Sequence, residues 1–257
     1  METATLIRVV DLETTGFAPP AEVCEIGWCD LRSTVFDLAG TPMGWFVHRP
    51  IDLPYGARLV RPRIPIPPET SAIHHIVDAD MTDPANLVEE WPASGEDRCR
   101  TMGGAPIHLF AAHNARMERQ WLTPEMTGAA RWICTYKAAL RLWPDAPSHS
   151  NQALRYWRRL PVDREIADRA HRAGPDAYVT AHLLADMLKQ PDVTVDRLVA
   201  WTEEPALLAK CNMGSWRGRR WSEIDEPSFL EWVLRRDFDE DTLFTARIYL
   251  DRMMEAT

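Results

Sequence analysis

The sequence predicts an α/β fold followed by a small, mostly helical C-terminal module. Short apolar and β-branched runs, typical of strands, fill the first 60 residues, and another such run lies at 107–112. Helical patterns dominate from there onward. A break at Gln190-Pro191 separates two helical stretches. We therefore expect one domain over residues 1–190 and a second, small module over residues 191–257.

The first predicted strand covers residues 6–12 and ends in two acids. Asp11 and Glu13 are two positions apart, and side chains alternate between the faces of a strand, so both carboxylates point the same way. Neighbouring carboxylates at the end of a core strand repel each other and lose hydration, and a divalent cation relieves both effects. The simpler alternative is a strand end with two solvated acids.

Further strands are expected at 23–31 and 44–48, and residues 58–60 either extend the latter strand or pair with it. The proline-rich stretch 61–68 predicts a rigid, extended connector, since proline has no backbone N–H to donate. Residues 78–105 are acidic and irregular, which is typical of a surface loop, and no function is assigned to that loop.

The strand at 107–112 leads into His113 and Asn114, and a helix is expected over 115–122 with Asn114 as its N-cap. Glu118 falls early in this helix, where acids are common because they interact favourably with the helix dipole. A role as a metal ligand is the alternative for this residue.

Two more helices are expected, at 132–142 and 150–160. The second carries three arginines within five residues. Such a cluster is either a solvated face or, beside an active site, a contact for a phosphate backbone. The three are Arg155, Arg158 and Arg159.

Two further segments carry notable histidines. His74 and His75 follow the connector and are either metal or substrate contacts or partly buried structural histidines. His171 lies in the loop ahead of a helix expected over 176–189, and Asp176 lies in the first turn of that helix. One loop can therefore present an imidazole and a carboxylate to the same pocket, unless the pair is a chance loop histidine and a helix-start acid.

The composition of the 257 residues argues against several classes of protein. A net charge of −9 does not suit a protein that coats nucleic acid by bulk charge, but it allows an enzyme that grips a few phosphates. We see neither a secretory leader nor a stretch long enough to span a membrane, so we expect no membrane partner. The five cysteines are odd in number and scattered, which favours a reducing cytoplasm over structural zinc.

Four acids and one histidine stand out as a candidate active site. Carboxylate ligands suit hard cations such as Mg²⁺ or Mn²⁺. Four carboxylates can hold two such ions about 3.5–4 Å apart, one to activate a water and one to stabilise the leaving oxygen of an in-line displacement at phosphorus. An imidazole suits the removal of the proton from the attacking water. The five residues are Asp11, Glu13, Glu118, Asp176 and His171.

Three motifs carry a resemblance to a known family. Asp-Leu-Glu-Thr-Thr-Gly begins at Asp11, His-Asn-Ala-Arg-Met-Glu ends at Glu118, and His-Arg-Ala-Gly-Pro-Asp begins at His171. In this order and spacing they resemble the DnaQ-like (DEDDh) 3′–5′ exonuclease family. Similarity to a DNA-degrading branch of that family extends over nearly the whole chain.

The resemblance implies an RNase-H-like fold, with a mixed sheet flanked by helices, and a metal-dependent enzyme. Such an enzyme hydrolyses terminal phosphodiester bonds at the 3′ ends of single-stranded or duplex DNA and releases nucleoside 5′-monophosphates. Its cofactors would be two divalent ions, Mg²⁺ or Mn²⁺. A role in DNA repair is part of the same implication.

The family's functional residues match positions of this chain. Metal-ligand positions correspond to Asp11, Glu13 and Asp176, and the general base corresponds to His171. Glu118 stands where the family usually has aspartate, and its longer side chain means that the helix shifts back, a water bridges, or the second ion binds weakly. We expect retained activity, because charge and ligand type are preserved. Positions that hold or flank the substrate correspond to Leu12, Thr14, Thr15, His74 and Asn114.

The C-terminal module resembles one that follows such exonuclease domains, and it holds a stretch that mixes cations with aromatic rings. Proteins that track single strands use this composition. The alternative is a module whose tryptophans pack it onto the exonuclease domain. The stretch comprises Trp216, Arg217, Arg219, Arg220 and Trp221.

Two other functions stay open at the level of sequence. A 3′–5′ exoribonuclease of the same fold is one, because the active-site motifs do not separate the two sugars. A non-catalytic nucleic-acid-binding module with a decayed site is the other, and Glu118 is its only support. The sequence does not indicate an oligomeric state.

Overall fold

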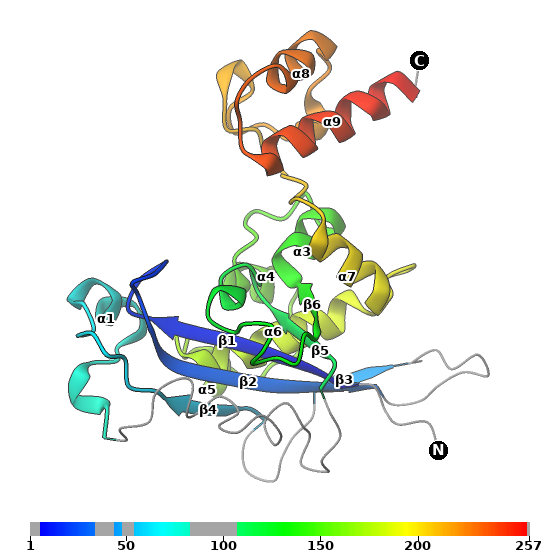
Figure 1. The fold of residues 1–257 in the computed structure, drawn as a ribbon. Coiled ribbons are helices and arrows are strands. Elements are labelled where there is room, and N and C mark those ends of the chain that lie inside the picture. Colours follow the sequence, from blue (N-terminus) through cyan, green and yellow to red (C-terminus); the bar gives the residue numbers. More distant parts are fainter. Residues whose placement is uncertain (1–5, 34–43, 48–53, 83–106, 256–257) are drawn as a thin grey trace.

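The computed structural model describes residues 6–33, 44–47, 54–82 and 107–255. Within these residues, one mixed sheet has the strand order β3-β2-β1-β5-β6, with β4 also paired to β2 (Figure 1). The strands are Leu6–Thr14 (β1), Val23–Ser33 (β2), Trp45–Val47 (β3), Gly56–Leu59 (β4), Leu109–Ala112 (β5) and Arg131–Cys134 (β6).

The register explains how the short strands complete the sheet. β1 runs antiparallel to β2 along its length and parallel to β5. The other edge of β2 carries β3 opposite residues 31–33 and β4 opposite residues 25–28, both antiparallel to it. β4 therefore continues the line of β3, which is the first of the two arrangements predicted for residues 58–60.

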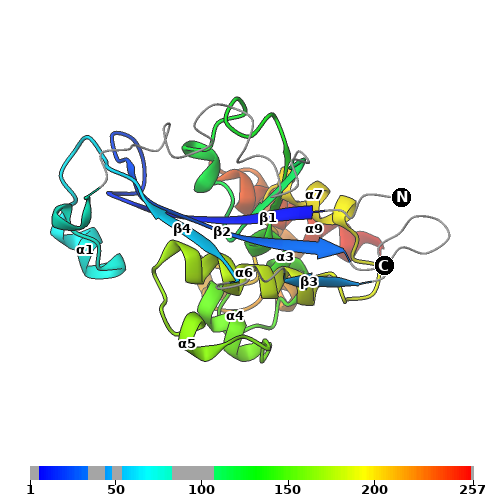
Figure 2. The ribbon, with the colours of Figure 1, turned by 90° about the horizontal axis from the view of Figure 1, so that it is seen from below.

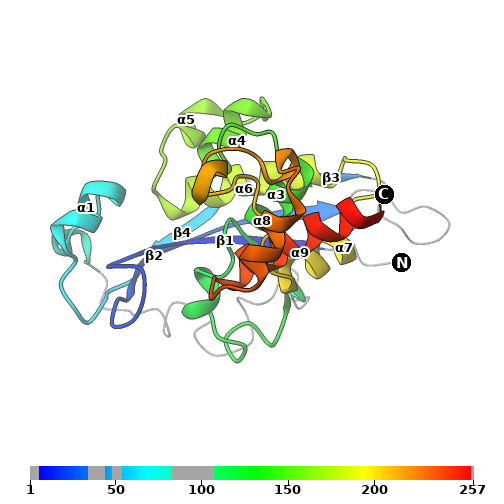
Figure 3. The same cartoon turned by 90° about the horizontal axis from the view of Figure 1, so that it is seen from above.

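Helices cover the sheet as the α/β prediction requires. In Figures 2 and 3, α4, α5 and α6 lie on one side of β1 and β2, and the segment that follows β5 lies on the other. Ile7 and Val9 belong to the core on the α6 side, and Val10 to the core on the opposite side. The helices are Pro68–His74 (α1), Thr135–Leu142 (α3), Asn151–Trp157 (α4), Arg164–Ala167 (α5), Ala173–Met187 (α6) and Val195–Glu203 (α7).

The predicted helix over 115–122 is wrong. Asn114 adopts a left-handed φ of 73°, not the extended conformation of an N-cap. Several N–H groups beyond it bond three residues back, as in the bond from Trp121 N to Glu118 O of 3.1 Å, and the segment forms turns and a short 3₁₀ helix, Glu118–Gln120. Pro124 has no N–H with which to extend a helix.

The helix predicted over 132–142 begins later than expected. Residues 132–134 belong to β6, and α3 begins at Thr135 with Cys134 as its N-cap, whose Sγ accepts a bond from Lys137 N at 3.5 Å. The pairing of β6 with β5 is a long-range contact, and it overrides the local helical pattern.

The C-terminal module has a core of its own. Pro227–Leu234 (α8) and Glu240–Glu255 (α9) stand away from the sheet in Figure 1. α7, by contrast, packs on β6 and α3. By its packing, α7 therefore groups with the sheet, and the division into two domains stays a prediction. The module core consists of Cys211, Trp216, Trp221, Ile224, Leu230, Val233 and Ala246.

Two tryptophans of the stretch that mixes cations with aromatic rings are buried in this module. Trp221 is fully buried and Trp216 is 8 % exposed, so both rings pack inside the module and offer no open face to a base. The burial of these two rings favours a packing role for them, and a contact between the module and nucleic acid stays a prediction.

Several expectations lie partly outside the described residues. Most of the predicted loop at 78–105 falls there, and so does Cys99. The described cysteines, Cys24, Cys29, Cys134 and Cys211, are buried free thiols. Among the described helices, none has the length and apolar character that a membrane crossing requires.

Candidate active site

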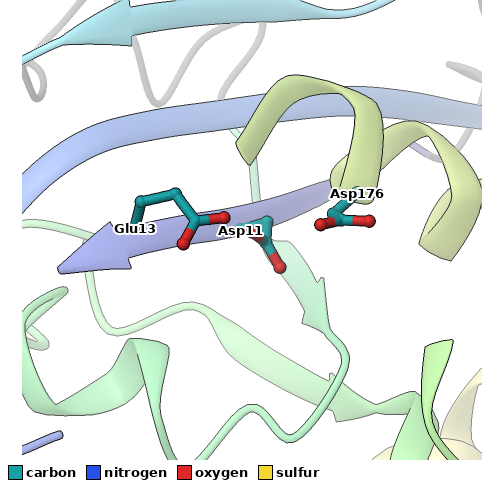
Figure 4. A group of neighbouring side chains, drawn as sticks. All are labelled: Asp11, Glu13 and Asp176. Atoms are coloured by element: carbon teal, nitrogen blue, oxygen red, sulfur yellow. The ribbon is translucent and has the colours of Figure 1, made fainter. Parts of the chain in front are cut away.

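Asp11 and Glu13 lie on the side of β1 that α6 covers. They share the alternation of Ile7 and Val9, which are fully buried in the core on that side. Figure 4 shows both carboxylates beside that of Asp176, which comes from α6. One carboxylate oxygen from each of the three residues lies within 4.8 Å of the other two. Two elements far apart in sequence thus build one acidic cluster.

Asp176 reaches the cluster because α6 begins directly against β2. A Cβ on Gly27 of β2 would lie 2.1 Å from the carbonyl carbon of Ala173, so only glycine allows this approach. The Asp176 carboxylate accepts a hydrogen bond from the backbone N–H of His171 at 2.7 Å and another from Gln152 Nε2 at 3.1 Å. These two bonds fix the orientation of the carboxylate.

Glu118 is buried close to the cluster but is not one of its three members. Its 3₁₀ helix contacts β1, and the residue is 3 % exposed. Its Oε2 is buried and has no hydrogen-bond partner in the part of the chain that the structure describes. An unpaired carboxylate oxygen is costly in a protein interior, and a cation would satisfy it. The structure brings together three of the four predicted ligands and leaves the fourth beside them.

Burial and mutual repulsion disfavour the charged form of these carboxyls. Burial, and next the charge of Asp176, raises the pKa of Asp11 well above its ordinary value. Burial is also the main cause that raises the pKa of Glu13 and of Glu118, each to about 8. The cluster therefore resists full ionisation on its own near neutral pH. Bound Mg²⁺ or Mn²⁺ would remove this repulsion, so the oxygen-only donor set fits such ions.

His171 lies at the rim of the cluster with its side chain exposed. Its backbone is left-handed, with φ of 61°, and this turn lets its N–H point at Asp176 while the chain enters α6. The imidazole is therefore open to water and attached to the same short loop as a cluster carboxylate. This arrangement suits a general base.

Known proteins are similar to this sequence over almost its whole length. No protein-family model matches the chain. It is 31% identical to exodeoxyribonuclease 10 of Escherichia coli strain K12 over 250 residues, which are 96% of this chain and 99% of that protein. The protein of the same name from an O6:H1 strain of Escherichia coli matches to the same extent. This chain belongs to the exonuclease X family.

Solved structures agree with the exonuclease X assignment. A structure of exonuclease X in complex with 5′-overhanging duplex DNA is 30% identical, with a TM-score of 0.57 over 76% of this chain and 99% of that one. A zinc-bound complex of E. coli exonuclease I with single-stranded DNA is 14% identical, with a TM-score of 0.53 over 77% of this chain and 42% of that one. The second match concerns the fold alone, and both are consistent with the predicted RNase-H-like sheet.

Two of the substrate contacts predicted for this member of the exonuclease X family, Thr14 and Thr15, lie at the end of β1. Thr14 Oγ1 donates to the carbonyl of Gly16 at 2.6 Å, and Thr15 Oγ1 accepts from the backbone N–H of Glu22 at 2.9 Å. Both threonines are buried and shape the turn after the strand. Their contact with a substrate stays a prediction.

The other three predicted substrate contacts differ in exposure. Leu12 is buried on the sheet face opposite Asp11. His74 is 2 % exposed, its Nδ1 accepts from the backbone N–H of Ile76 at 3.1 Å, and burial lowers its pKa. Asn114 is exposed. The roles of these residues also stay predictions.

Sequence reasoning missed Glu25, which lies on β2 directly opposite Glu13. It is 2 % exposed and accepts hydrogen bonds from Arg172 Nε at 3.0 Å, Arg172 Nη2 at 2.6 Å and Ala173 N at 2.9 Å. Glu25 thus ties the His171 loop and the start of α6 to the sheet. An acid inside an apolar strand was the available signal, because such a charge needs a partner.

Proposed function

We propose that this chain is a metal-dependent 3′–5′ exonuclease that acts on DNA and releases nucleoside 5′-monophosphates. The observation that carries the proposal is the carboxylate cluster of Asp11, Glu13 and Asp176, with His171 bonded to it through its backbone. The choice of DNA rests on the family, whose curated member is named an exodeoxyribonuclease and whose solved member binds duplex DNA.

The chain supplies ligands, a proton acceptor and a rigid frame for this reaction. Bound Mg²⁺ or Mn²⁺ would polarise the scissile phosphodiester and acidify the attacking water. The three clustered carboxylates would hold such ions, with Glu118 as a fourth ligand. The His171 imidazole would accept the proton of the attacking water, a role that contributes roughly 10²–10⁴-fold. The hydrogen bond from the backbone N–H of His171 to Asp176 holds the general base and the metal ligand in a fixed geometry.

The test uses single-stranded DNA oligonucleotides labelled at either end, incubated with the full chain and Mg²⁺. We expect the 3′ label to leave first as a mononucleotide and the 5′-labelled strand to shorten stepwise. EDTA should abolish both signals. An absence of cleavage with Mg²⁺ and with Mn²⁺ would contradict the proposal, and a faster reaction on RNA of the same sequence would overturn the choice of DNA.

A further inference from the structure

α4 connects the carboxylate cluster to an exposed aromatic side chain. Gln152, in the first turn of this helix, donates to the Asp176 carboxylate at 3.1 Å. Tyr156 follows four residues later, so the two side chains share one face of the helix, with their Cβ atoms about 5–6 Å apart. Tyr156 is 61 % exposed. An aromatic ring therefore stands at the rim of the active site, one helical turn from a side chain that touches it.

The Tyr156 ring is held by the loop that carries His171. Its hydroxyl donates to Asp168 Oδ1 at 3.3 Å, and the guanidinium carbon of Arg155 lies 4.7 Å from the ring centroid. Arg155 is itself 3 % exposed, and it donates to Ala167 O at 2.6 Å and to Asp168 Oδ1 at 2.7 Å. One side of the ring thus rests on a buried and ordered cation, while most of the ring faces solvent.

The segment around Tyr156 is rich in arginine, although the protein as a whole is acidic. Residues 151–172 contain six arginines and three acids, whereas the whole chain carries a net charge of −9. Arg159, Arg164 and Arg169 are exposed within this segment. Four of the six arginines form ion pairs, Arg155 and Arg164 with Asp168, Arg158 with Asp186 and Arg172 with Glu25. The exposed Arg159 and Arg169 are therefore the groups of this segment that suit contact with the phosphates of a strand.

We propose that Tyr156 stacks against a base of the strand whose 3′ end occupies the active site, a few nucleotides from that end. The inference rests on the proposed function, because it needs a nucleic-acid strand at the carboxylate cluster. Exposed aromatic rings among arginines are the means by which proteins hold single strands. A ring already ordered by Arg155 and Asp168 loses little freedom when a base stacks on it.

Trp157 provides the matched control. It neighbours Tyr156 in sequence and is also exposed, at 39 %. Its ring packs edge-to-face on Trp143, with centroids 6.2 Å apart, and it lies about 100° further round the helix. A Trp157→Ala substitution therefore removes an exposed ring and some packing on Trp143, but it leaves the Tyr156 ring on the Gln152 face in place.

The experiment compares two substrates of the full chain with Mg²⁺. One is a single-stranded DNA oligonucleotide, and the other is the p-nitrophenyl ester of thymidine 5′-monophosphate, which contains only the terminal nucleotide. Tyr156→Ala should lower the oligonucleotide-to-ester ratio of kcat/KM about tenfold, mainly through KM for the oligonucleotide. Tyr156→Phe should keep most of the ratio because it keeps the ring, and Trp157→Ala should keep it too. An unchanged ratio in Tyr156→Ala, including an equal loss on both substrates, would overturn the proposal.

A binding measurement keeps the inference separate from the proposed function. Anisotropy of a fluorescent single-stranded oligonucleotide, with Ca²⁺ in place of Mg²⁺, reports on binding without turnover. Tyr156→Ala should raise Kd about tenfold relative to wild type and to Trp157→Ala. Equal values would overturn the stacking role even in an active enzyme, whereas failure of wild type to hydrolyse either substrate would overturn the proposed function alone.

Discussion

The centre of the active site and its rim differ in both charge and burial. At the centre, burial raises the pKa of Asp11 and of Asp176. At the rim, Arg159 and Arg169 are exposed to water. Buried like charges interact through a low dielectric and require a cation, whereas exposed arginines are solvated and contribute little until a polyanion approaches. From this difference we infer that the centre would need a bound ion for the proposed chemistry, and that the rim would collect and align a strand.

Removal of one charge from the carboxylate cluster should have the largest effect on activity. Asp11→Asn keeps the shape of the side chain but removes a ligand charge, so kcat/KM on single-stranded DNA should fall by about 10⁴-fold. The same variant should melt at a higher temperature than wild type in EDTA, because repulsion within the cluster is reduced. Asp196→Asn is the control, since that aspartate is exposed on α7 and pairs with Arg131. Lower stability together with full activity would contradict this account of the centre.

Loss of the imidazole should have the next largest effect. His171→Ala should lower kcat by about 10²–10⁴-fold in steady-state assays at saturating DNA. His75→Ala is a close match, because His75 is also exposed and has the same φ of 61°. A similar loss in both variants would point to backbone strain and not to proton transfer.

Glu25→Gln tests whether the sheet must hold the loop of His171 and the start of α6 in place for activity. This change weakens the hold of the sheet on Arg172 and Ala173, so the Asp176 ligand and the His171 base should lose their alignment. We expect kcat/KM to fall roughly 10-fold, as for other residues that orient ligands.

A second ion pair of the same strand serves as the control for Glu25. Asp30 pairs with Arg8 at 2.9 Å on β2. Asp30→Asn should cost stability without lowering kcat/KM at a temperature at which both variants are folded. Equal losses of activity in Glu25→Gln and Asp30→Asn would show that any disruption of β2 lowers activity.

The pH dependence of stability should differ with and without metal. Glu13 and Glu118 have folded pKa values of about 8, raised mainly by burial from an ordinary 4.5. The native state then binds more protons than the unfolded state between these values, so without metal the free energy of unfolding falls as pH rises from about 4.5 to 8. Chemical denaturation at a series of pH values should show this slope in EDTA and a flatter or reversed one in Mg²⁺. A slope that Mg²⁺ does not alter would place the ions elsewhere.

The smallest effect is expected at Glu118. Glu118→Asp restores the shorter acid that the resemblance implies at this position, and the charge is unchanged. Its activity with Mg²⁺ should equal or exceed that of wild type, measured as kcat/KM on DNA. A large loss would show that the site is built around the longer side chain.

Local rules were sufficient for some of the site. Alternation along a strand placed Asp11 and Glu13 on one side, and β1 has them there. A local rule also explains where α7 begins, because the side chain of Thr194 caps the helix by accepting a hydrogen bond from Arg197 N. The helix expected at 176–189 begins instead at Ala173, because its first turn bonds to Glu25 of the sheet.

What local rules could not supply came from long-range contacts. The partners of Glu25 lie almost 150 residues away in the chain. Trp221 is buried by a module core that no local pattern specifies. Tyr156 lies at the rim because α4, α5 and α6 meet at one loop. The sequence placed Arg155 in one cluster with Arg158 and Arg159, and only the folded structure shows that Arg155 is buried while its neighbour Tyr156 is exposed.

The most direct test of the central claim is the binding of Mn²⁺ to the full chain, followed by electron paramagnetic resonance of the free ion. The claim is that the carboxylates of Asp11, Glu13 and Asp176 form a divalent-cation site. Wild type should remove Mn²⁺ from solution with up to two ions per chain, and Asp11→Asn should bind at least about tenfold more weakly. Equal binding by the two proteins, or no binding by wild type, would contradict the claim.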